Sequence, residues 1–262
     1  MSLFSPELKH HSPSSINSFI EYRTSWFLQR IQNKWTKAGV HAARGTAVEA
    51  GINYWLSNED CTKEDAIKEA LEVFTKESLH LSDTFSIRQT IAPCVVATMD
   101  SFEEKGYTFG AELQKEIRTR LKGCNKDIIG KLDYFIDGNR VIDTKVVSKT
   151  PSSLKQGYIL QGSIYRLATG LPVYFHFAVP LKTKIVIKEI MLTDEDYKYG
   201  IQLATVAARH IERIFDNLDC LDGDLLKSMF FVNPTSLFSA DDKKLMGDEF
   251  GLTIPQWKPE ED

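Results

Sequence analysis

Two carboxylates and one ammonium group stand close together in the middle of the chain. Asp133 ends one short apolar run, and Asp143, followed two residues later by Lys145, ends the next. Between the runs, Gly138-Asn139 indicates a tight hairpin turn, because both residue types tolerate the positive φ angles of such turns. The pattern predicts two antiparallel strands with the carboxylates on neighbouring positions and with Asp143 and Lys145 on one face. Such a group can hold a divalent cation and act on water or a phosphate.

The same residues also have a simpler interpretation as solvated side chains beside a hairpin. Features on either side of the hairpin favour the interpretation as a cation-binding, reactive site. Upstream, residues 44–56 have helical periodicity, and the small Gly45 would allow close packing one turn before Glu49. Downstream, Pro151-Ser152-Ser153 indicates a helix start with serine as the N-cap. On that helix, Gln161 and Tyr165 are four residues apart and share one face.

The chain resembles the PD-(D/E)XK nuclease superfamily in four motifs, which in chain order are Gly45…Glu49, Gly130-x-x-Asp133, Asp143-x-Lys145 and Gln161-x-x-x-Tyr165. The resemblance is closest to the branch with RecB-type nuclease domains, phage recombination exonucleases and CRISPR adaptation nucleases. It covers most of the chain: residues 12–19 look like the opening helix of that branch, and residues 231–234 look like its C-terminal segment. It implies an α/β fold with a restriction-endonuclease-like core, in which a mixed central sheet is flanked by helices and preceded by an N-terminal helical lobe.

The resemblance also implies metal-dependent hydrolysis of phosphodiester bonds. The implied ligands of one or two Mg²⁺ or Mn²⁺ ions are Glu49, Asp133, Asp143 and the backbone carbonyl of Val146; hard oxygen ligands suit these ions. Lys145 would orient the attacking water or help to deprotonate it, and would stabilise charge on the phosphate. Gln161 and Tyr165 would position the strand or brace Lys145.

Two features depart from the pattern of the branch. Many relatives carry His where this chain has Glu49, which resembles the phage-exonuclease variant and can still bind magnesium. Relatives with an iron–sulfur cluster carry one Cys in the opening helix and three near the C-terminus, whereas this chain has Tyr22 in that helix and no Cys after residue 233. Its four cysteines have no ligand spacing, so no cluster is expected. The histidines also lack metal spacing, and His176, in an apolar strand, is expected to be packed.

Nucleic-acid contacts are predicted at three basic residues. Arg44 is a candidate phosphate clamp, with an ordinary surface role as the alternative; Lys149 and Lys155 are further candidates. Trp26 and Trp35 could stack on bases, but core positions are the favoured interpretation for both. The net charge is −4, yet residues 111–149 carry nine basic and six acidic side chains, a local excess that suits DNA.

The periodicity of the chain predicts the elements that must position these residues. Helices are expected over about 14–32, 44–56 and 87–105, with Pro93 as a boundary or kink in the last, and over residues that follow a capping box at Thr62–Asp65. Strands are expected at 111–121, 128–136, 140–147, 173–179 and 185–192. A final helix is expected from a capping box at Thr193–Asp196 to about residue 218. A mixed sheet with helices on both faces is the natural assembly.

Length and composition are typical of a compact enzyme. The 262 residues are 42% hydrophobic and 26% charged, which predicts one nuclease domain spanning 1–262. Its expected parts are a helical region over about 14–106, a sheet-bearing core over 111–218 and a C-terminal segment with an acidic tail over 219–262. No signal peptide and no apolar run long enough to span a bilayer are found. We therefore expect a cytoplasmic protein, in the host cytoplasm if it is phage-encoded, with no membrane partner.

Three functional hypotheses follow. The first is a DNA exonuclease of phage or bacterial recombination or repair, which acts on linear ends. The branch allows a single-strand annealing or recombination protein as a partner and a homo-oligomer such as a closed ring. The second is a CRISPR-type spacer-processing nuclease without the cluster. The third is a non-catalytic module that binds nucleic-acid ends. Because decayed nucleases usually lose an acid or the lysine, the complete set of these groups favours an enzyme.

Overall fold

The computed structural model describes residues 7–82, 84–107 and 111–218. The chain forms two compact units and passes from one to the other more than once. The described part of unit 1 comprises residues 7–37, 120–128 and 202–218. Unit 2 comprises the described residues within 38–119 and 129–201. In the described ranges, no helix is both long and apolar enough to cross a membrane.

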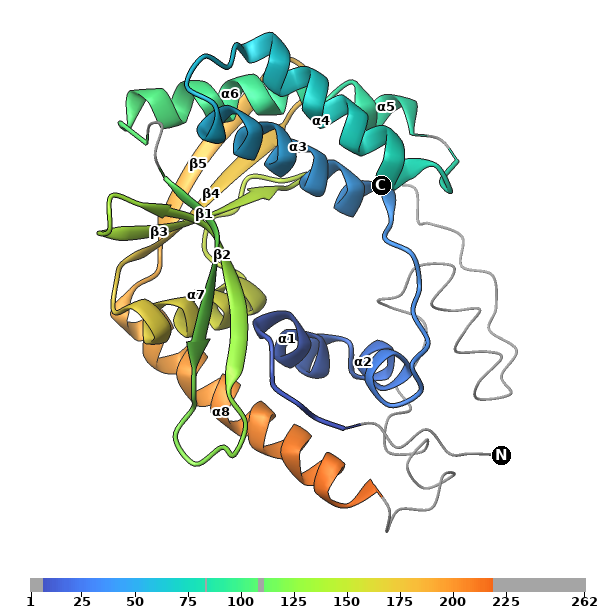
Figure 1. Cartoon of the computed structure of the whole chain (residues 1–262), viewed down its shortest axis with the longest axis vertical. Helices are drawn as coiled ribbons and strands as arrows, with labels where there is room; N and C mark the ends of the chain where they lie inside the picture. The colour runs from blue at the N-terminus through green and yellow to red at the C-terminus, as the bar shows by residue number, and fades with distance from the viewer. Residues whose placement is uncertain (1–6, 83, 108–110, 219–262) are drawn as a thin grey trace. The chain divides into compact units, whose positions relative to one another are not determined.

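A five-stranded mixed sheet organises unit 2 (Figure 1). Its strands stand in the order β1 (Glu112–Thr119), β2 (Ile128–Ile136), β3 (Arg140–Val146), β4 (Val173–Pro180) and β5 (Ile185–Met191). Strands β2 and β3 are antiparallel, β3 and β4 are parallel, and β4 and β5 are antiparallel. All five strands lie where alternation and turn residues predict them, so the expected mixed α/β architecture is confirmed.

The predicted hairpin joins β2 and β3, but its turn lies one residue earlier than expected. Positive φ angles occur at Asp137 (50°) and Gly138 (65°), and the Asn139 N–H donates to the Ile136 carbonyl at 3.1 Å. The central pair of the turn is therefore Asp-Gly rather than Gly-Asn, the combination favoured in turns with two positive φ angles. The antiparallel pairing Tyr134↔Ile142 then brings the preceding residue of β2, Asp133, beside Asp143.

Three long helices cover one face of the sheet (Figure 1). They are α3 (Val40–Ser57), α4 (Lys63–Ser78) and α6 (Ile91–Glu104). The predicted capping box starts α4, because Thr62 and Asp65 exchange side-chain-to-backbone hydrogen bonds. Apolar residues of these helices pack against buried residues of β2, β3 and β4, among them Tyr134, Ile142 and Ala178. This helical layer carries Glu49 on α3 to the sheet.

The opposite face of the sheet is covered by α7 (Gln156–Thr169) (Figure 1). Tyr158 of α7 lies 5.5 Å, between ring centroids, from both Phe175 and Phe177 of β4. The residue between them, His176, faces the other layer, where its Nε2 lies 3.0 Å from Ser101 Oγ. His176 is fully buried, as predicted. Successive side chains of β4 point to opposite faces of the sheet, so they pack alternately against α7 and against the layer of α3, α4 and α6.

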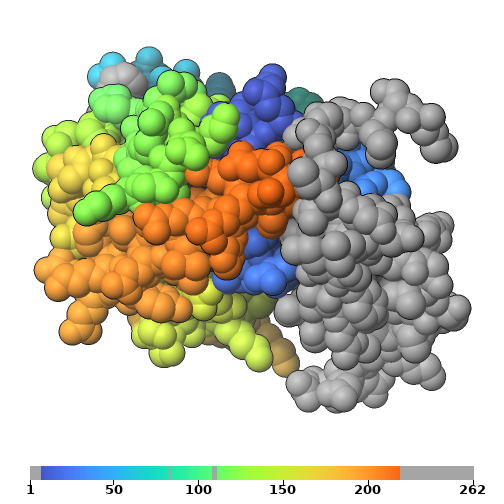
Figure 2. All heavy atoms as spheres, turned by 90° about the horizontal axis from the view of Figure 1, so that it is seen from below, coloured from blue at the N-terminus to red at the C-terminus, as the bar shows by residue number. Residues whose placement is uncertain are grey.

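Unit 1 contains α1 (Pro13–Glu21), α2 (Arg23–Arg30) and the C-terminal part of α8 (Asp194–Asp216). The capping box at Thr193 and Asp196 is confirmed. In Figure 2 the orange residues of α8 lie at the surface. Arg209 Nη2 of this helix donates to the Lys122 carbonyl at 2.8 Å. Trp26 is 1% exposed, and its Nε1 donates to Ser15 Oγ at 3.1 Å, which confirms its predicted core position.

Several helix boundaries differ from the predictions. The helix expected over 44–56 begins four residues earlier, at Val40. The helix expected over 14–32 is broken at Tyr22, whose ψ of 54° interrupts the helical backbone. The helix expected over 87–105 is interrupted between α5 (Phe85–Arg88) and α6, and Pro93 occupies the first turn of α6, where a missing N–H costs nothing. Helix α7 begins at Gln156 with Lys155 as the N-cap and no side-chain cap, so Ser152 and Ser153 do not cap it.

Candidate active site

The two central carboxylates and the lysine meet on adjacent strands of unit 2. Asp143 is fully buried, and its Oδ1 forms an ion pair with the Lys145 ammonium group. The Thr144 N–H donates to Asp133 Oδ2 at 3.2 Å, which links the second carboxylate to the same strand. The group predicted from the two apolar runs is therefore assembled by the β2–β3 hairpin.

Helix α7 contributes the next two predicted residues. Gln161 Nε2 donates to Asp143 Oδ2 at 2.9 Å and lies 2.7 Å from the Tyr165 hydroxyl. That hydroxyl donates to the Lys131 carbonyl at 2.8 Å. The i, i+4 pair thus acts as one unit, but it braces Asp143 and the β2 backbone, whereas a contact with Lys145 was one of the expectations.

Glu49 reaches the group from α3 and is held by two amides that the sequence analysis did not identify. Gln114 Nε2 of β1 donates to Glu49 Oε1 at 2.5 Å, and the Asn53 side chain also hydrogen-bonds to Glu49. Gln114 has a φ of 49°, an uncommon conformation for a residue other than glycine. Asn53 could have been found from its spacing of four from Glu49 on a helix, whereas no sequence signal marks Gln114.

Burial and mutual repulsion define the electrostatics of the site. Burial and then the Asp143 charge raise the pKa of Asp133 well above its usual value. Burial also raises the pKa of Asp143 and of Glu49, against the effect of Lys145. Burial alone would lower the pKa of Lys145, but the charges of Asp143 and Asp133 outweigh it and raise that pKa. Burial therefore disfavours ionisation of all three carboxylates, and the charge of Asp143 adds to this effect at Asp133 and Glu49.

The donor set fits a hard divalent cation. Glu49, Asp133 and Asp143 offer only oxygen atoms, and a bound cation would stabilise the charged form that burial disfavours in all three. Within the described ranges, however, no three His, Cys, Asp or Glu side chains converge as a finished metal site. The carboxylates are instead directed to Lys145, Gln161, Gln114 and the Thr144 N–H. Binding an ion would require some of these hydrogen bonds to be exchanged for metal contacts.

The remaining predicted residues are dispersed. Val146 is the last residue of β3, close in sequence to Asp143 and Lys145. Lys149 and Lys155 are exposed in the connection to α7 and at its N-cap. Arg44 is only 3% exposed, and burial lowers its pKa, so in this conformation it lies away from solvent and not on a surface open to DNA. Gly45 does not provide close packing, because a Cβ there would meet nothing within 4 Å.

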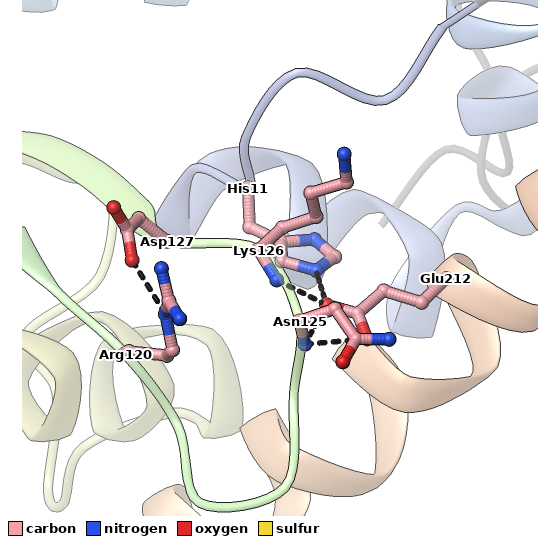
Figure 3. A network of polar contacts seen from close by, with 6 residues as sticks. All are labelled: His11, Arg120, Asn125, Lys126, Asp127 and Glu212. Carbon is pink, nitrogen blue, oxygen red and sulfur yellow. Dashed lines mark hydrogen bonds and ion pairs between the residues drawn. The ribbon is translucent and has the colours of Figure 1, made fainter.

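A second polar cluster, in unit 1, was also missed by the sequence analysis (Figure 3). The Glu212 carboxylate of α8 accepts the backbone N–H groups of Asn125 at 2.9 Å and Lys126 at 2.8 Å. His11 Nε2 lies 3.2 Å from the same carboxylate, and both side chains are almost fully buried. The cluster joins segments far apart in sequence, which is why spacing did not reveal it.

The cysteines of the described residues do not form a cluster site. Cys61, Cys94 and Cys124 are free thiols. Cys94 lies beside Arg44, and burial raises its pKa to about 11, so it remains protonated at neutral pH. The fourth cysteine, Cys220, and the C-terminal segment 231–234 lie outside the described residues.

Comparison with known proteins supports the fold. No protein-family model and no curated protein matches the chain. Among solved structures, a candidate exonuclease from Eubacterium rectale is similar, with 18% sequence identity, a TM-score of 0.59, and coverage of 87% of this chain and 91% of that one. LHK-Exo, an alkaline exonuclease from Laribacter hongkongensis, is in its complex with dAMP 13% identical over 81% of this chain and 93% of that one, with a TM-score of 0.43. At these identities the likeness to the Eubacterium rectale protein establishes a shared fold.

Proposed function

We propose that the protein is a metal-dependent DNA exonuclease. The observation that carries the proposal is the ion pair of the buried Asp143 with Lys145 on β3. Asp133 of β2 is held to the same strand through the Thr144 N–H, and Glu49 of α3 interacts electrostatically with Asp143 and Lys145. The shared fold with a candidate exonuclease supports the same reaction class. The three carboxylates and the lysine that the resemblance requires are all present in the sequence. This complete set favours an enzyme over a non-catalytic module that binds DNA ends.

The proposed chemistry divides between the side chains and one or two Mg²⁺ or Mn²⁺ ions. Glu49, Asp133, Asp143 and the Val146 carbonyl would hold the ion, which when bound supplies Lewis acidity and lowers the pKa of a water ligand. Lys145 would orient the attacking water and stabilise charge on the scissile phosphate. Gln161 and Tyr165 would keep Asp143 in place. Lys149 and Lys155, both exposed, are the proposed phosphate contacts.

The biological setting is also part of the proposal. A role in phage or bacterial recombination or repair would make linear DNA ends the substrate, a single-strand annealing or recombination protein the partner, and a homo-oligomer the assembly. The spacer-processing alternative of the CRISPR branch predicts the same chemistry, so the two are separated by substrate and partner rather than by the site. Both place the protein in the cytoplasm.

Digestion of end-labelled DNA tests the reaction. Linear and covalently closed circular DNA would be incubated with Mg²⁺, Mn²⁺, Ca²⁺ or EDTA. We expect linear DNA to be degraded with Mg²⁺ or Mn²⁺ and circular DNA to survive, and we expect Ca²⁺ to allow binding without turnover, because it accepts longer and more numerous ligands. Activity that survives chelation would exclude the proposed chemistry. Cutting of closed circles would exclude an exonuclease.

The absence of an iron–sulfur cluster remains a prediction. We expect anaerobically purified protein to show no visible absorbance band of such a cluster. We also expect a variant with all four cysteines changed to serine or alanine to fold and cut DNA, because four converging thiolates are normally required for a [4Fe–4S] cluster. A stoichiometric cluster, or a folded but inactive cysteine-free variant, would contradict the prediction.

A further inference from the structure

Unit 1 contains a pocket that the proposed active site does not use. Its volume is about 270 Å³, and it is lined by residues 7–10, by α1 and α2, and by the segment that follows α2. Two tryptophans contribute to it, Trp26 and Trp35. We call it the Trp35 pocket. This volume is slightly below the usual range of ligand sites, so the pocket suits one small planar group with its substituent.

The two tryptophans have different positions. Trp26 is buried, with its ring edge-on to Phe19 at 4.9 Å and to Phe215 at 6.2 Å between centroids. Trp35 is 58% exposed, which contradicts its predicted core position. An exposed indole presents a large apolar and polarisable surface to solvent, so the pocket has an aromatic face available to a ligand.

The exposed indole is nevertheless held in place. Trp35 Nε1 donates to Asn33 Oδ1 at 3.1 Å. Asn33 itself adopts a φ of 52°, a conformation that asparagine tolerates better than most residues. The Arg30 guanidinium carbon lies 5.3 Å from the Trp35 ring centroid, within the range of a cation–π contact. A ring fixed from two sides loses little conformational entropy when a second planar group stacks on it.

Positive charge accompanies the aromatic surface. Lys9 and Arg30 line the pocket, with His10 beside them and Glu7 as the one acid of the lining. Arg30 forms no ion pair with another described residue. Burial of part of Arg30 lowers its pKa, although the group stays charged near neutrality. An unneutralised guanidinium next to a stacking surface suits an anion attached to a planar ring.

We propose that the Trp35 pocket binds one unpaired nucleotide of single-stranded DNA, with the base on the Trp35 indole and the backbone phosphate near Arg30 and Lys9. This inference rests on the proposed function, which makes DNA the substrate. A combination of aromatic surface and cations binds single strands with little sequence preference, because every base has a π-face. A blunt duplex keeps its bases stacked on one another and offers none to the indole.

Binding to a labelled oligonucleotide without turnover tests the proposal. Fluorescence anisotropy in EDTA would compare single-stranded DNA with a blunt duplex, for the full-length protein and its variants. We expect Trp35→Ala to weaken single-strand binding by about 5- to 100-fold, the range of one lost base–aromatic stack. Trp35→Phe should restore most of the affinity, and Arg30→Gln should lower the salt dependence of binding by roughly one phosphate contact. Circular dichroism would establish that each variant is folded.

A matched control removes an exposed aromatic side chain elsewhere. Phe85, in unit 2, is 71% exposed and does not line the pocket, so Phe85→Ala should bind like the wild type. Wild-type affinity in Trp35→Ala would overturn the proposal. An equal loss for single strands and blunt duplex would overturn it as well, because stacking requires an unpaired base.

Cleavage of the same oligonucleotides in Mg²⁺ separates this proposal from the proposed function. If the wild type cuts DNA while Trp35→Ala binds it normally, only the pocket assignment fails. If single-strand binding depends on Trp35 but the wild type cuts nothing with Mg²⁺ or Mn²⁺, the pocket assignment stands and the nuclease assignment fails.

Discussion

At the scale of single residues, the positions of the acids and the lysine were predictable because two apolar runs with a turn sequence between them place these residues on neighbouring strands. Asp133, Asp143 and Lys145 lie on two short strands joined by a hairpin, in which Asp143 pairs with Lys145 and Asp133 accepts the Thr144 N–H. The residues that support them were less visible. Gln114 bonds Glu49 from another strand and does so in a positive-φ conformation, which depends on tertiary context rather than on local pattern. The burial of Arg44 was also not predictable, because it too depends on tertiary packing.

Replacing Gln114 tests whether its amide positions Glu49. We expect Gln114→Ala and Gln114→Gly each to lower the cleavage rate by about 10- to 100-fold and to weaken Mn²⁺ binding, because groups that orient a metal ligand typically contribute that much. Glycine accepts a φ of 49° without strain, so the glycine variant should be the more stable of the two. Rates and the Mn²⁺ dependence of cleavage would be measured for both variants. Wild-type activity in Gln114→Gly would show that the amide is dispensable.

At the scale of elements, the sequence predicted strands and caps better than helix breaks. The capping boxes at Thr62 and Thr193 were read correctly because their hydrogen bonds are local. The break at Tyr22 was not, since apolar periodicity continues across it. Close helix packing was assigned to Gly45, yet it occurs at Gly51, where a Cβ would lie 2.7 Å from the Ala66 carbonyl oxygen of α4. Which glycine meets a neighbour depends on the helix crossing, and this is not encoded in one helix alone.

The two glycines of α3 provide a matched pair of substitutions. Gly51→Ala should destabilise the protein by about 1–3 kcal/mol, because the added methyl group overpacks the contact between α3 and α4. Gly45→Ala adds the same methyl group in open space and should be neutral or stabilising by up to about 1 kcal/mol, since alanine favours the helix. Denaturant unfolding monitored by circular dichroism measures both. Equal effects of the two substitutions would contradict the packing described for Gly51.

At the scale of the whole molecule, the division into two units was not predictable from the sequence. The sequence suggested consecutive regions, whereas the described part of unit 1 combines residues 7–37, 120–128 and 202–218. Glu212 illustrates the difficulty: its partners are His11 and the backbone of residues 125 and 126, far away in sequence. No periodicity or spacing rule connects such positions, and only the assembled unit shows that this carboxylate ties them together.

The His11–Glu212 contact predicts a pH dependence of stability. Burial lowers the pKa of His11 from its ordinary 6.5, against the effect of Glu212. The backbone N–H groups of Asn125 and Lys126 lower the pKa of Glu212, against the effect of burial. In both cases the unfolded chain takes up its proton first as the pH falls, so stability present above about pH 6.5 is lost progressively toward pH 4.

His11→Gln isolates the histidine, because glutamine keeps an N–H donor but does not titrate. We expect the difference in thermal unfolding midpoint between wild type and His11→Gln to change most between pH 6.5 and 5. Taking the difference removes the contributions of the active-site carboxylates, whose raised pKa values act in the opposite direction. A difference that is constant over this range would show that His11 does not contribute as described.

Single-turnover cleavage by Asp143→Asn tests the proposed active site most directly. The matched control is Asp137→Asn, the same chemical change in the hairpin turn, where asparagine also tolerates the positive φ of 50°. With Mg²⁺ and end-labelled linear DNA, we expect Asp143→Asn to lose at least about 10²-fold in rate while DNA binding and the circular dichroism spectrum stay close to wild type. Asp137→Asn should cut at the wild-type rate. Cleavage by Asp143→Asn at a rate near that of Asp137→Asn would contradict the assignment of the site.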